Sequence, residues 1–478
     1  MMTRGKTIRA WSAGLAGMAT LLAAGTPASG AQAPAQPGKA PESILPVPQA
    51  SPAPLPAPAP APVPAPAASP VPAAPGAPVV APPAAPVLDP VMNWTLADAQ
   101  ALLGVITAVD EDGLIPADYQ PDALRAAIAA GAGAALDAQA SRSFTWLVED
   151  MRDGRTRMDS RHQWFVVDPD VDLNPTAQVM TQALASHDIA GAIAALAPTH
   201  PDYRALKAAL AATPKAEKAA RNLIRVNLDR WRWLPRDMGK YYLLTNLPEF
   251  QLRLTVDNSI IRSYRTVIGK PGKTQTPNLA EQVEAVVFNP TWTVPQSIVK
   301  GEGLGARLLA NPASAARQGY KVTKAKDGTI TVVQQPGDNN SLGRMKIDMP
   351  NEHAIYLHDT PSKSLFNTPV RAYSHGCVRT ERAVELGMTM AILGAGITPQ
   401  QAANISLSGK YTRVLMTKTF PVYLTYFTMA TDISGKLGKF ADVYGRDVPV
   451  LASFAAPRAA WDGKRKSSEA VVKLDNPL

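Results

Sequence analysis

One side chain in this sequence is well suited to nucleophilic chemistry, the thiol of Cys377. It is the only cysteine among 478 residues, and residues 1–33 have the layout of an export signal. An unpaired cysteine in an exported protein cannot form an internal disulfide and is a candidate reactive thiol. Gly376 before it suits a tight turn that brings backbone N–H groups close to a ligand. Residues 378–386 are expected to form a helix, whose N-terminus would favour the nucleophilic thiolate.

A thiolate needs a base, and two histidines lie near Cys377 in the sequence. His358 ends the segment 354–358, whose alternation predicts a half-buried strand. In such a strand Tyr356 and His358 project from the same face, toward the cleft that Cys377 would face. His375 is the other candidate, although it could instead orient the loop. A Cys–His pair whose histidine is held by a third group is the usual arrangement for covalent acyl transfer.

These residues stand within several unusual segments that occur in a characteristic order. Together the segments resemble the L,D-transpeptidases with a YkuD-type catalytic domain, and among these the YcbB-like branch. The resemblance extends from about residue 94 to the C-terminus. The segments that carry it are Arg230–Pro235, Phe288–Pro295, Asn340–Arg344, Tyr356–Lys363 and Tyr373–Arg379.

The resemblance implies a reaction on peptidoglycan and a role for each residue of the pair. Cys377 would attack the amide before the terminal D-alanine of a tetrapeptide stem, and an amine of a second stem would resolve the thioester into a cross-link. His358 would accept the thiol proton and donate it to the leaving amine. The main-chain carbonyl of Asp359 would hold the second ring nitrogen, with the Asp359 carboxylate as the competing candidate. Carbapenems would acylate the same cysteine.

The tetrahedral intermediate needs preorganised hydrogen-bond donors. The backbone N–H groups of Gly376 and Cys377 are the natural choice, with the Tyr356 hydroxyl as a possible third donor. Ser374 is expected to support the turn through a hydrogen bond, and His375 is assigned to support as well.

Arg379 has two interpretations that the sequence does not separate. It could bind a substrate carboxylate with both arms of its guanidinium. It could equally pair with Glu381 or another acid. Tyr356 is similarly open between contacting the substrate and packing.

Other functions share the same residues and stay open at this stage. Water would turn the thioester enzyme into an L,D-carboxypeptidase, and a free D-amino acid would give exchange. A wall-associated scaffold with a silent site is the non-enzymatic alternative, which intact Cys377, His358 and Gly376 disfavour. A papain-like protease has its cysteine before its histidine, and a sortase has a wider gap between the two. No metal and no cofactor is implied, because the histidines lack ligand spacing.

The composition of the chain limits the classes of molecule that the protein is expected to bind. Hydrophobic residues make up 46% of the chain, which is ample for a packed core, and the formal charge is +9. No concentrated basic face of the kind that binds nucleic acid is visible. The expected partners are peptidoglycan stem peptides in the periplasm or cell envelope, and a monomer is expected. If the signal is not cleaved, it would serve as an inner-membrane tether.

The chain divides by composition into five parts and is expected to be a multidomain α+β protein. A helical scaffold domain precedes a mainly β catalytic domain, whose strands are short and separated by frequent turns. An irregular insertion in the catalytic domain at about 298–343 is expected to be a lid. The parts are a signal peptide at 1–33, a Pro/Ala-rich linker at 34–91, the scaffold domain at 92–222, the catalytic domain at 223–455 and a polar tail, expected to fray, at 456–478.

Overall fold

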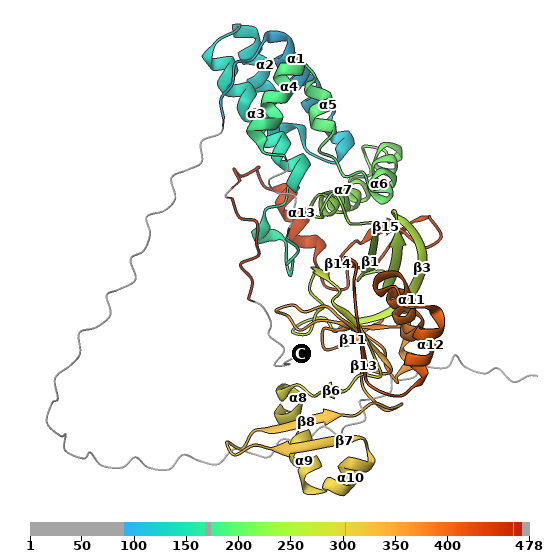
Figure 1. Cartoon of the computed structure of the whole chain (residues 1–478). Coiled ribbons are helices and arrows are strands. Elements are labelled where there is room, and N and C mark those ends of the chain that lie inside the picture. The colour runs from blue at the N-terminus through green and yellow to red at the C-terminus, as the bar shows by residue number, and fades with distance from the viewer. Residues whose placement is uncertain (1–89, 168–173, 302, 462, 471–478) are drawn as a thin grey trace, which may run out of the picture. The chain divides into compact units, whose positions relative to one another are not determined.

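The computed structural model describes residues 90–167, 174–301, 303–461 and 463–470, which belong to one compact unit. A helical region is followed by a mainly β region, as Figure 1 shows, and this confirms the predicted fold class. The predicted signal peptide and nearly all of the Pro/Ala-rich linker lie outside the described residues. Within the described part of the chain, no helix has the length and apolar character needed to cross a membrane.

The helical region begins where the sequence predicts it. The Thr95 hydroxyl accepts a hydrogen bond from the Asp98 N–H and caps the first helix, which satisfies a donor that the helix itself cannot pair. Apolar side chains at helical spacing, such as Leu102 and Ile106, are fully buried in the core of this region. The helices are α1 Leu96–Ala108, α2 Pro121–Ala130, α3 Ala134–Asp153, α4 Thr176–Ser186, α5 Ile189–Ala194, α6 Pro201–Ala212 and α7 Lys218–Arg232.

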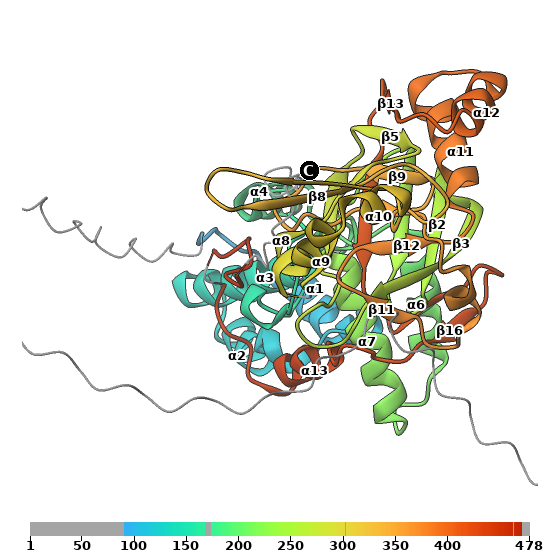
Figure 2. The same cartoon turned by 90° about the horizontal axis from the view of Figure 1, so that it is seen from below.

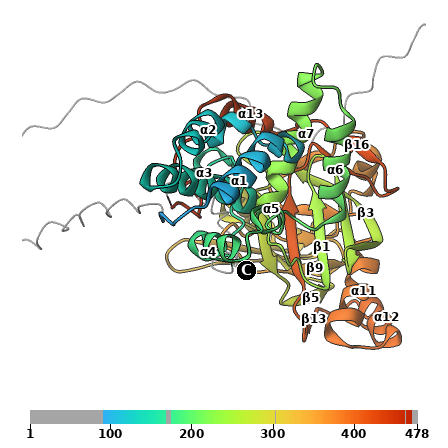
Figure 3. The ribbon, with the colours of Figure 1, turned by 90° about the horizontal axis from the view of Figure 1, so that it is seen from above.

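Helix α7 connects the helical region to the sheet. Its residues Ile224 and Leu228 share a buried cluster with Tyr242 and Leu244 from the first strand, and Figure 3 shows α7 near that strand. The domain boundary expected at 222/223 therefore falls inside a single helix. The apolar stripe of α7 faces the strands, which explains why the composition changes there while the helix continues.

The β region is organised around one sheet of eleven strands. Its order is β13-β5-β9-β10-β12-β3-β2-β1-β14-β4, and β11 pairs with β3. The strands are β1 Tyr241–Asn246, β2 Gln251–Val256, β3 Ser259–Gly269, β4 Leu279–Gln282, β5 Ala285–Phe288, β9 Met345–Asp348, β10 Leu357–His358, β11 Ala372–Ser374, β12 Val378–Thr380, β13 Thr412–Leu415 and β14 Pro421–Thr425.

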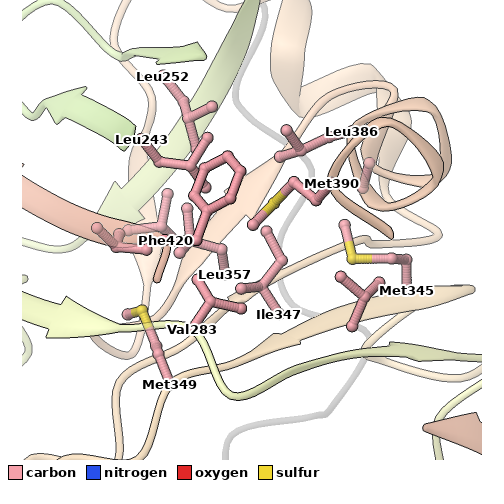
Figure 4. Packing of buried hydrophobic residues seen from close by; sticks show 14 of the residues in the cluster. Leu243, Leu252, Val283, Met345, Ile347, Met349, Leu357, Leu386, Met390 and Phe420 are labelled. Atoms are coloured by element: carbon pink, nitrogen blue, oxygen red, sulfur yellow. The ribbon is translucent and has the colours of Figure 1, made fainter. Parts of the chain in front are cut away.

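Two helices follow the central strands, α11 Ala383–Ala395 and α12 Pro399–Leu407. Leu386 and Met390 of α11 pack with Met345 and Ile347 of β9, as Figure 4 shows. This core lies beneath β9, β10 and β12 and holds these three strands in fixed register.

The predicted lid insertion is more regular than its glycine-rich sequence indicates. The folded unit begins a few residues before the predicted start, with β6 Trp292–Thr293 and α8 Gln296–Gly301. It continues with α9 Leu304–Ala310, α10 Pro312–Arg317, β7 Tyr320–Lys324 and β8 Ile330–Gln334. A small core of its own includes Val299, Leu308 and Val332. The insertion, drawn in yellow and gold in Figure 2, has a separate sheet in the order β6-β8-β7. It is therefore a small folded unit with its own apolar core.

The C-terminal segment is partly docked, in contrast to the frayed tail expected from its polar sequence. It follows β15 Met429–Thr431, β16 Leu437–Lys439 and α13 Asp447–Ala455. The Arg458 guanidinium is buried and lies 2.6 Å from Glu149 and 2.9 Å from Asp150, both on α3. Its carbon atom CZ also lies 4.7 Å from the centroid of the Trp146 ring. A buried ion pair thus holds the segment around Arg458 against the helical region.

Replacing Arg458 with methionine is expected to lower the free energy of unfolding by about 3 kcal/mol, because two buried carboxylates lose their main counter-charge. Denaturant unfolding of the full chain measures this loss. The matched control is Arg125→Met, because Arg125 forms an exposed pair with Asp122, and we expect a change of about 1 kcal/mol or less. Equal losses in the two variants would contradict a stabilising role for the docked segment.

Candidate active site

His358 ends strand β10, and Cys377 lies in the bend immediately before the neighbouring strand β12 Val378–Thr380. Strands β10 and β12 pair in parallel, with Leu357 opposite Val378 and His358 opposite Arg379. Leu357 and Val378 point into the core, so the residues that alternate with them face the other side. His358 is then a diagonal neighbour of Cys377, and such neighbours lie roughly 7–8 Å apart at the backbone, within reach of side chains.

The helix expected directly after Cys377 is absent. Val378–Thr380 form strand β12, and the helix begins only at Ala383. The reason is tertiary: β12 is paired on one side with β10 and on the other with β3, and this pairing outweighs local helical preference. A helix dipole therefore does not stabilise a Cys377 thiolate in this structure.

The turn before Cys377 is tightly hydrogen-bonded. The Ser374 hydroxyl donates to the Cys377 carbonyl at 2.5 Å and accepts from the Gly376 N–H at 3.2 Å. Gly376 has φ of 122°, a backbone conformation that favours glycine. From a distant loop the Thr276 hydroxyl donates to the Gly376 carbonyl at 2.7 Å. The contact of Thr276 with this turn could not be predicted from sequence spacing, because it depends on the fold.

These bonds change the set of available oxyanion donors. The Gly376 N–H already bonds to the Ser374 hydroxyl, so it is committed to the turn. The Cys377 N–H has no acceptor within the described part of the chain. The His375 side chain is exposed on the turn. The free donor at the turn is therefore the N–H of Cys377.

His358 is held in one orientation by its neighbour. Its Nδ1 lies 2.5 Å from the main-chain oxygen of Asp359, and a neutral ring that donates from Nδ1 keeps Nε2 as a proton acceptor. The Asp359 carboxylate accepts from the Arg344 N–H at 3.0 Å and pairs with Lys363. Of the two acceptors considered for the ring, the main-chain oxygen makes the contact. Burial, together with the nearby Arg379 charge, lowers the pKa of His358 to about 3.

The resting thiol is neutral. Burial raises the pKa of Cys377 to about 11, and hydrogen bonds from Tyr356 and the charges of Lys346 and Arg379 offset only part of this rise. The S–H group contacts the Ala354 carbonyl oxygen at 3.7 Å. The helix expected to favour a thiolate is absent after Cys377, and burial favours the neutral thiol. A neutral thiol needs a base to become nucleophilic.

The alkylation rate of Cys377 by iodoacetamide is expected to rise about tenfold for each pH unit between 7 and 9, because only the thiolate reacts. The rate should level only near pH 11, since a raised pKa favours the protonated form up to that pH. Intact-mass measurement follows the reaction without ambiguity, as the chain has one cysteine. A plateau below pH 8 would show a thiolate that burial does not suppress.

Arg379 is a half-buried cation beside the thiol. Its expected partner Glu381 instead pairs with Arg265, at 2.5 Å. No carboxylate of the residues that the structure describes lies within ion-pairing distance of Arg379. Pairing with Glu381 is therefore wrong, and the guanidinium is available for an anionic group of a substrate.

Lys346 is a residue of the site that sequence reasoning missed. It lies on β9 directly opposite His358. Its ammonium group is 4.5 Å from the centroid of the Tyr356 ring and 3.3 Å from the Asp348 carboxylate. The Tyr356 side chain in turn hydrogen-bonds the Cys377 sulfur. Only the register of the sheet reveals Lys346, because nothing in its local sequence points to the thiol.

Replacing Lys346 with methionine is expected to slow Cys377 alkylation at pH 8 by about threefold, because a nearby positive charge stabilises the thiolate. The matched control is Lys240→Met, since Lys240 also lies over a tyrosine ring, that of Tyr241, at 5.7 Å. The control should leave the rate unchanged. Identical rates in the two variants would remove Lys346 from the electrostatics of the thiol.

Comparison with known proteins agrees with this architecture. Residues 240–387 match the L,D-transpeptidase catalytic domain called YkuD, and residues 92–210 match a scaffold domain. The chain therefore contains a region that matches the YkuD-type L,D-transpeptidase catalytic domain, preceded by a region that matches a scaffold domain. The narrower assignment to the YcbB-like branch stays a prediction.

A curated relative from Haemophilus influenzae, named provisionally as an L,D-transpeptidase, is 28% identical over 239 residues. The match covers 47% of this chain and 48% of the relative, so the chain spans about half the length of that protein. Among solved structures, an L,D-transpeptidase from Mycobacterium smegmatis is 16% identical over 39% of this chain and 58% of its own, with a TM-score of 0.20. The catalytic domain of an Enterococcus faecium enzyme acylated by ertapenem is 16% identical over 39% of this chain and 98% of its own, with a TM-score of 0.21.

Proposed function

We propose that this protein is a peptidoglycan L,D-transpeptidase that works through a thioester on Cys377. The observation that carries the proposal is the placement of His358, fixed through Nδ1 by the Asp359 carbonyl, on the strand beside Cys377. The same placement would serve a carboxypeptidase or an exchange enzyme, which differ only in the acceptor.

The first half of the reaction forms the acyl-enzyme. His358 Nε2 takes the thiol proton as the Cys377 sulfur bonds to the carbonyl carbon of the third residue of a stem peptide. The amide C–N bond then breaks, and His358 returns the proton to the leaving D-alanine amine. Because both groups are neutral at rest, the proton transfer accompanies the attack.

The second half transfers the acyl group. An amine of a second stem attacks the thioester carbon, His358 accepts the amine proton, and the sulfur leaves and is reprotonated. The Cys377 N–H and the Tyr356 hydroxyl stabilise the oxyanion in both halves. Arg379 binds a carboxylate of the stem, and Ser374, Gly376 and His375 support the turn.

Incubation of the protein with synthetic tetrapeptide stems tests this proposal. Mass spectrometry should find the tripeptide acyl group on the proteolytic fragment that contains Cys377, together with free D-alanine and a cross-linked dimer. Free tripeptide without dimer would indicate a carboxypeptidase, and a mass exchange with added D-amino acid would indicate exchange. Release of D-alanine with no adduct at Cys377 would defeat the thioester route. A carbapenem is a second probe for the same sulfur.

The proposed site of action is the periplasm or cell envelope, with the export signal at 1–33 and a monomeric protein. The linker at 34–91 would act as a spacer if the signal remains as an inner-membrane tether. Sequencing of the mature N-terminus separates the two arrangements. A mature chain that begins near Ala31 would leave no tether.

A further inference from the structure

A cavity lies next to Thr276, the residue whose hydroxyl donates to the Gly376 carbonyl of the turn before Cys377. Its volume is about 570 Å³, within the range of roughly 300–1,000 Å³ typical of ligand sites. Residues from three distant parts of the chain line it: His162 and Gln163, the loop that contains Lys273 and Gln275, and the segment from Tyr444 to Pro449 at the start of α13. Cys377 does not line this cavity, which is therefore separate from the site described above.

The cavity is lined by a buried guanidinium, that of Arg446. Arg446 is 5% exposed, and its guanidinium bonds to the Asn278 amide oxygen at 2.6 Å and to the Thr276 carbonyl at 2.9 Å. Its carbon atom CZ lies 4.9 Å and 4.8 Å from the ring centroids of Tyr426 and Tyr444. No carboxylate in the described ranges forms a close ion pair with it, and its Nε has no hydrogen-bond partner there. Glu469, which also lines the cavity, acts on Arg446 only through its charge. A buried charge without a close ion-pair partner is costly, and an anion bound to it would relieve that cost.

The surroundings of Arg446 are also favourable to an anion. Lys273 is exposed at the rim of the cavity, and the N-terminal turn of α13 contributes the positive end of a helix dipole. The one carboxylate lining the cavity, that of Glu469, accepts hydrogen bonds from Gln163 and lies 3.2 Å from the His162 ring. The lining therefore carries two cationic side chains, Arg446 and Lys273, and one anionic side chain, Glu469.

The cavity is connected to the catalytic turn through one residue. Arg446 donates to the Thr276 carbonyl, and the Thr276 hydroxyl donates to the Gly376 carbonyl. A ligand held by Arg446 would thus lie close behind the residue that precedes Cys377. This closeness favours a ligand that belongs to the same substrate.

We propose that this cavity binds the carboxylate end of a short peptide, with Arg446 and Lys273 as its cationic contacts. The assignment of that peptide to peptidoglycan stems rests on the proposed function. The volume accommodates several residues of a peptide, which is more than a single inorganic ion requires.

Lysine footprinting on the full chain carrying Cys377→Ala tests the site without turnover. The protein is acetylated with and without a tetrapeptide stem, and each lysine is followed by mass spectrometry. Acetylation of Lys273 is expected to slow about fivefold at saturating peptide, because its ammonium group is engaged. Lys270 lies in the same loop but does not line the cavity, so its rate should not change and it serves as the internal control.

Two further ligands and two variants identify the chemical group that the cavity recognises. A stem amidated at its C-terminus should protect Lys273 much less, and inorganic phosphate alone should protect it no better than the free stem. Arg446→Lys should reduce the peptide affinity about tenfold, because lysine has no counterpart of the Nε–H that Arg446 leaves without a partner. If that variant does not fold, Lys273→Met should still weaken binding about threefold in calorimetry.

An unchanged Lys273 rate, or equal protection by the amidated stem, would overturn the proposal. Protection by phosphate but not by peptide would also overturn it, in favour of a phosphate site. Protection of Lys273 without any acyl-enzyme in the wild-type protein would keep this site and remove the proposed function. An acyl-enzyme in the wild-type protein without protection of Lys273 would keep the proposed function and remove this site.

Discussion

Cross-linking of tetrapeptide stems is expected to fall to background, a loss of about 10⁴-fold or more, when Cys377 is replaced by alanine. The chain has one cysteine, so no second thiol can take over the acyl group. Alanine fits where the thiol lies, because it is smaller and leaves the Ser374–Cys377 main-chain hydrogen bond intact. The dimer yield, quantified by chromatography, measures the effect.

The controls separate chemistry from folding. The variant should keep its melting temperature within a few degrees and should still bind the tetrapeptide, since alanine removes only the sulfur. It should also lose carbapenem labelling completely. A dimer formed at the wild-type rate by the alanine variant would mean that another group carries the acyl intermediate.

Replacing His358 with glutamine is expected to slow acyl-enzyme formation by about 10²–10⁴-fold, the range for loss of a positioned general base. The effect should be large here because the Cys377 thiol is protonated at neutral pH, its pKa being about 11, and cannot attack unaided. Mass spectrometry of the adduct in samples quenched at successive times measures the rate. The loss should shrink as the pH approaches 11, because the thiolate then forms without a base.

The matched control is His200→Gln, because His200 is a half-buried histidine whose ring stacks on Trp231 with 4.2 Å between centroids. Trp231 belongs to a core cluster that does not include Cys377. Burial lowers the pKa of His200 to about 4, so it is neutral at pH 7 as His358 is. This variant should acylate at the wild-type rate. If His358→Gln retains full activity, the base role moves to His375, which is exposed on the turn.

Much of the site could be predicted from local sequence. Cys377 stands out because it is the single thiol after an export signal, and Gly376 marks the turn before it. Tyr356 and His358 share one face because side chains alternate along an extended segment, and their rings lie 5.5 Å apart between centroids. The contact of His358 with the Asp359 carbonyl involves consecutive residues. Such features depend on chain geometry over a few residues, so they can be predicted without knowledge of the fold.

Features that depend on distant segments were missed or predicted wrongly. Thr276 and Lys346 reach the site from a loop and a strand far away in the sequence, and Arg446 contacts Thr276 from a third segment. Only sheet register and loop packing bring these residues together. The segment after Cys377 forms a strand rather than a helix because β3 and β10 pair with it on both sides.

The protonation state of the thiol is also a feature that the tertiary structure decides and the local sequence does not. Residue types show that a cysteine and a histidine are present, whereas the pKa of each depends on burial and on neighbouring charges. Burial arises from the packing of the whole domain around β10 and β12, and it keeps both groups neutral at rest. The proposed nucleophile and base can therefore be predicted from the local sequence, while their charge and their additional partners arise from contacts between residues that are remote along the chain.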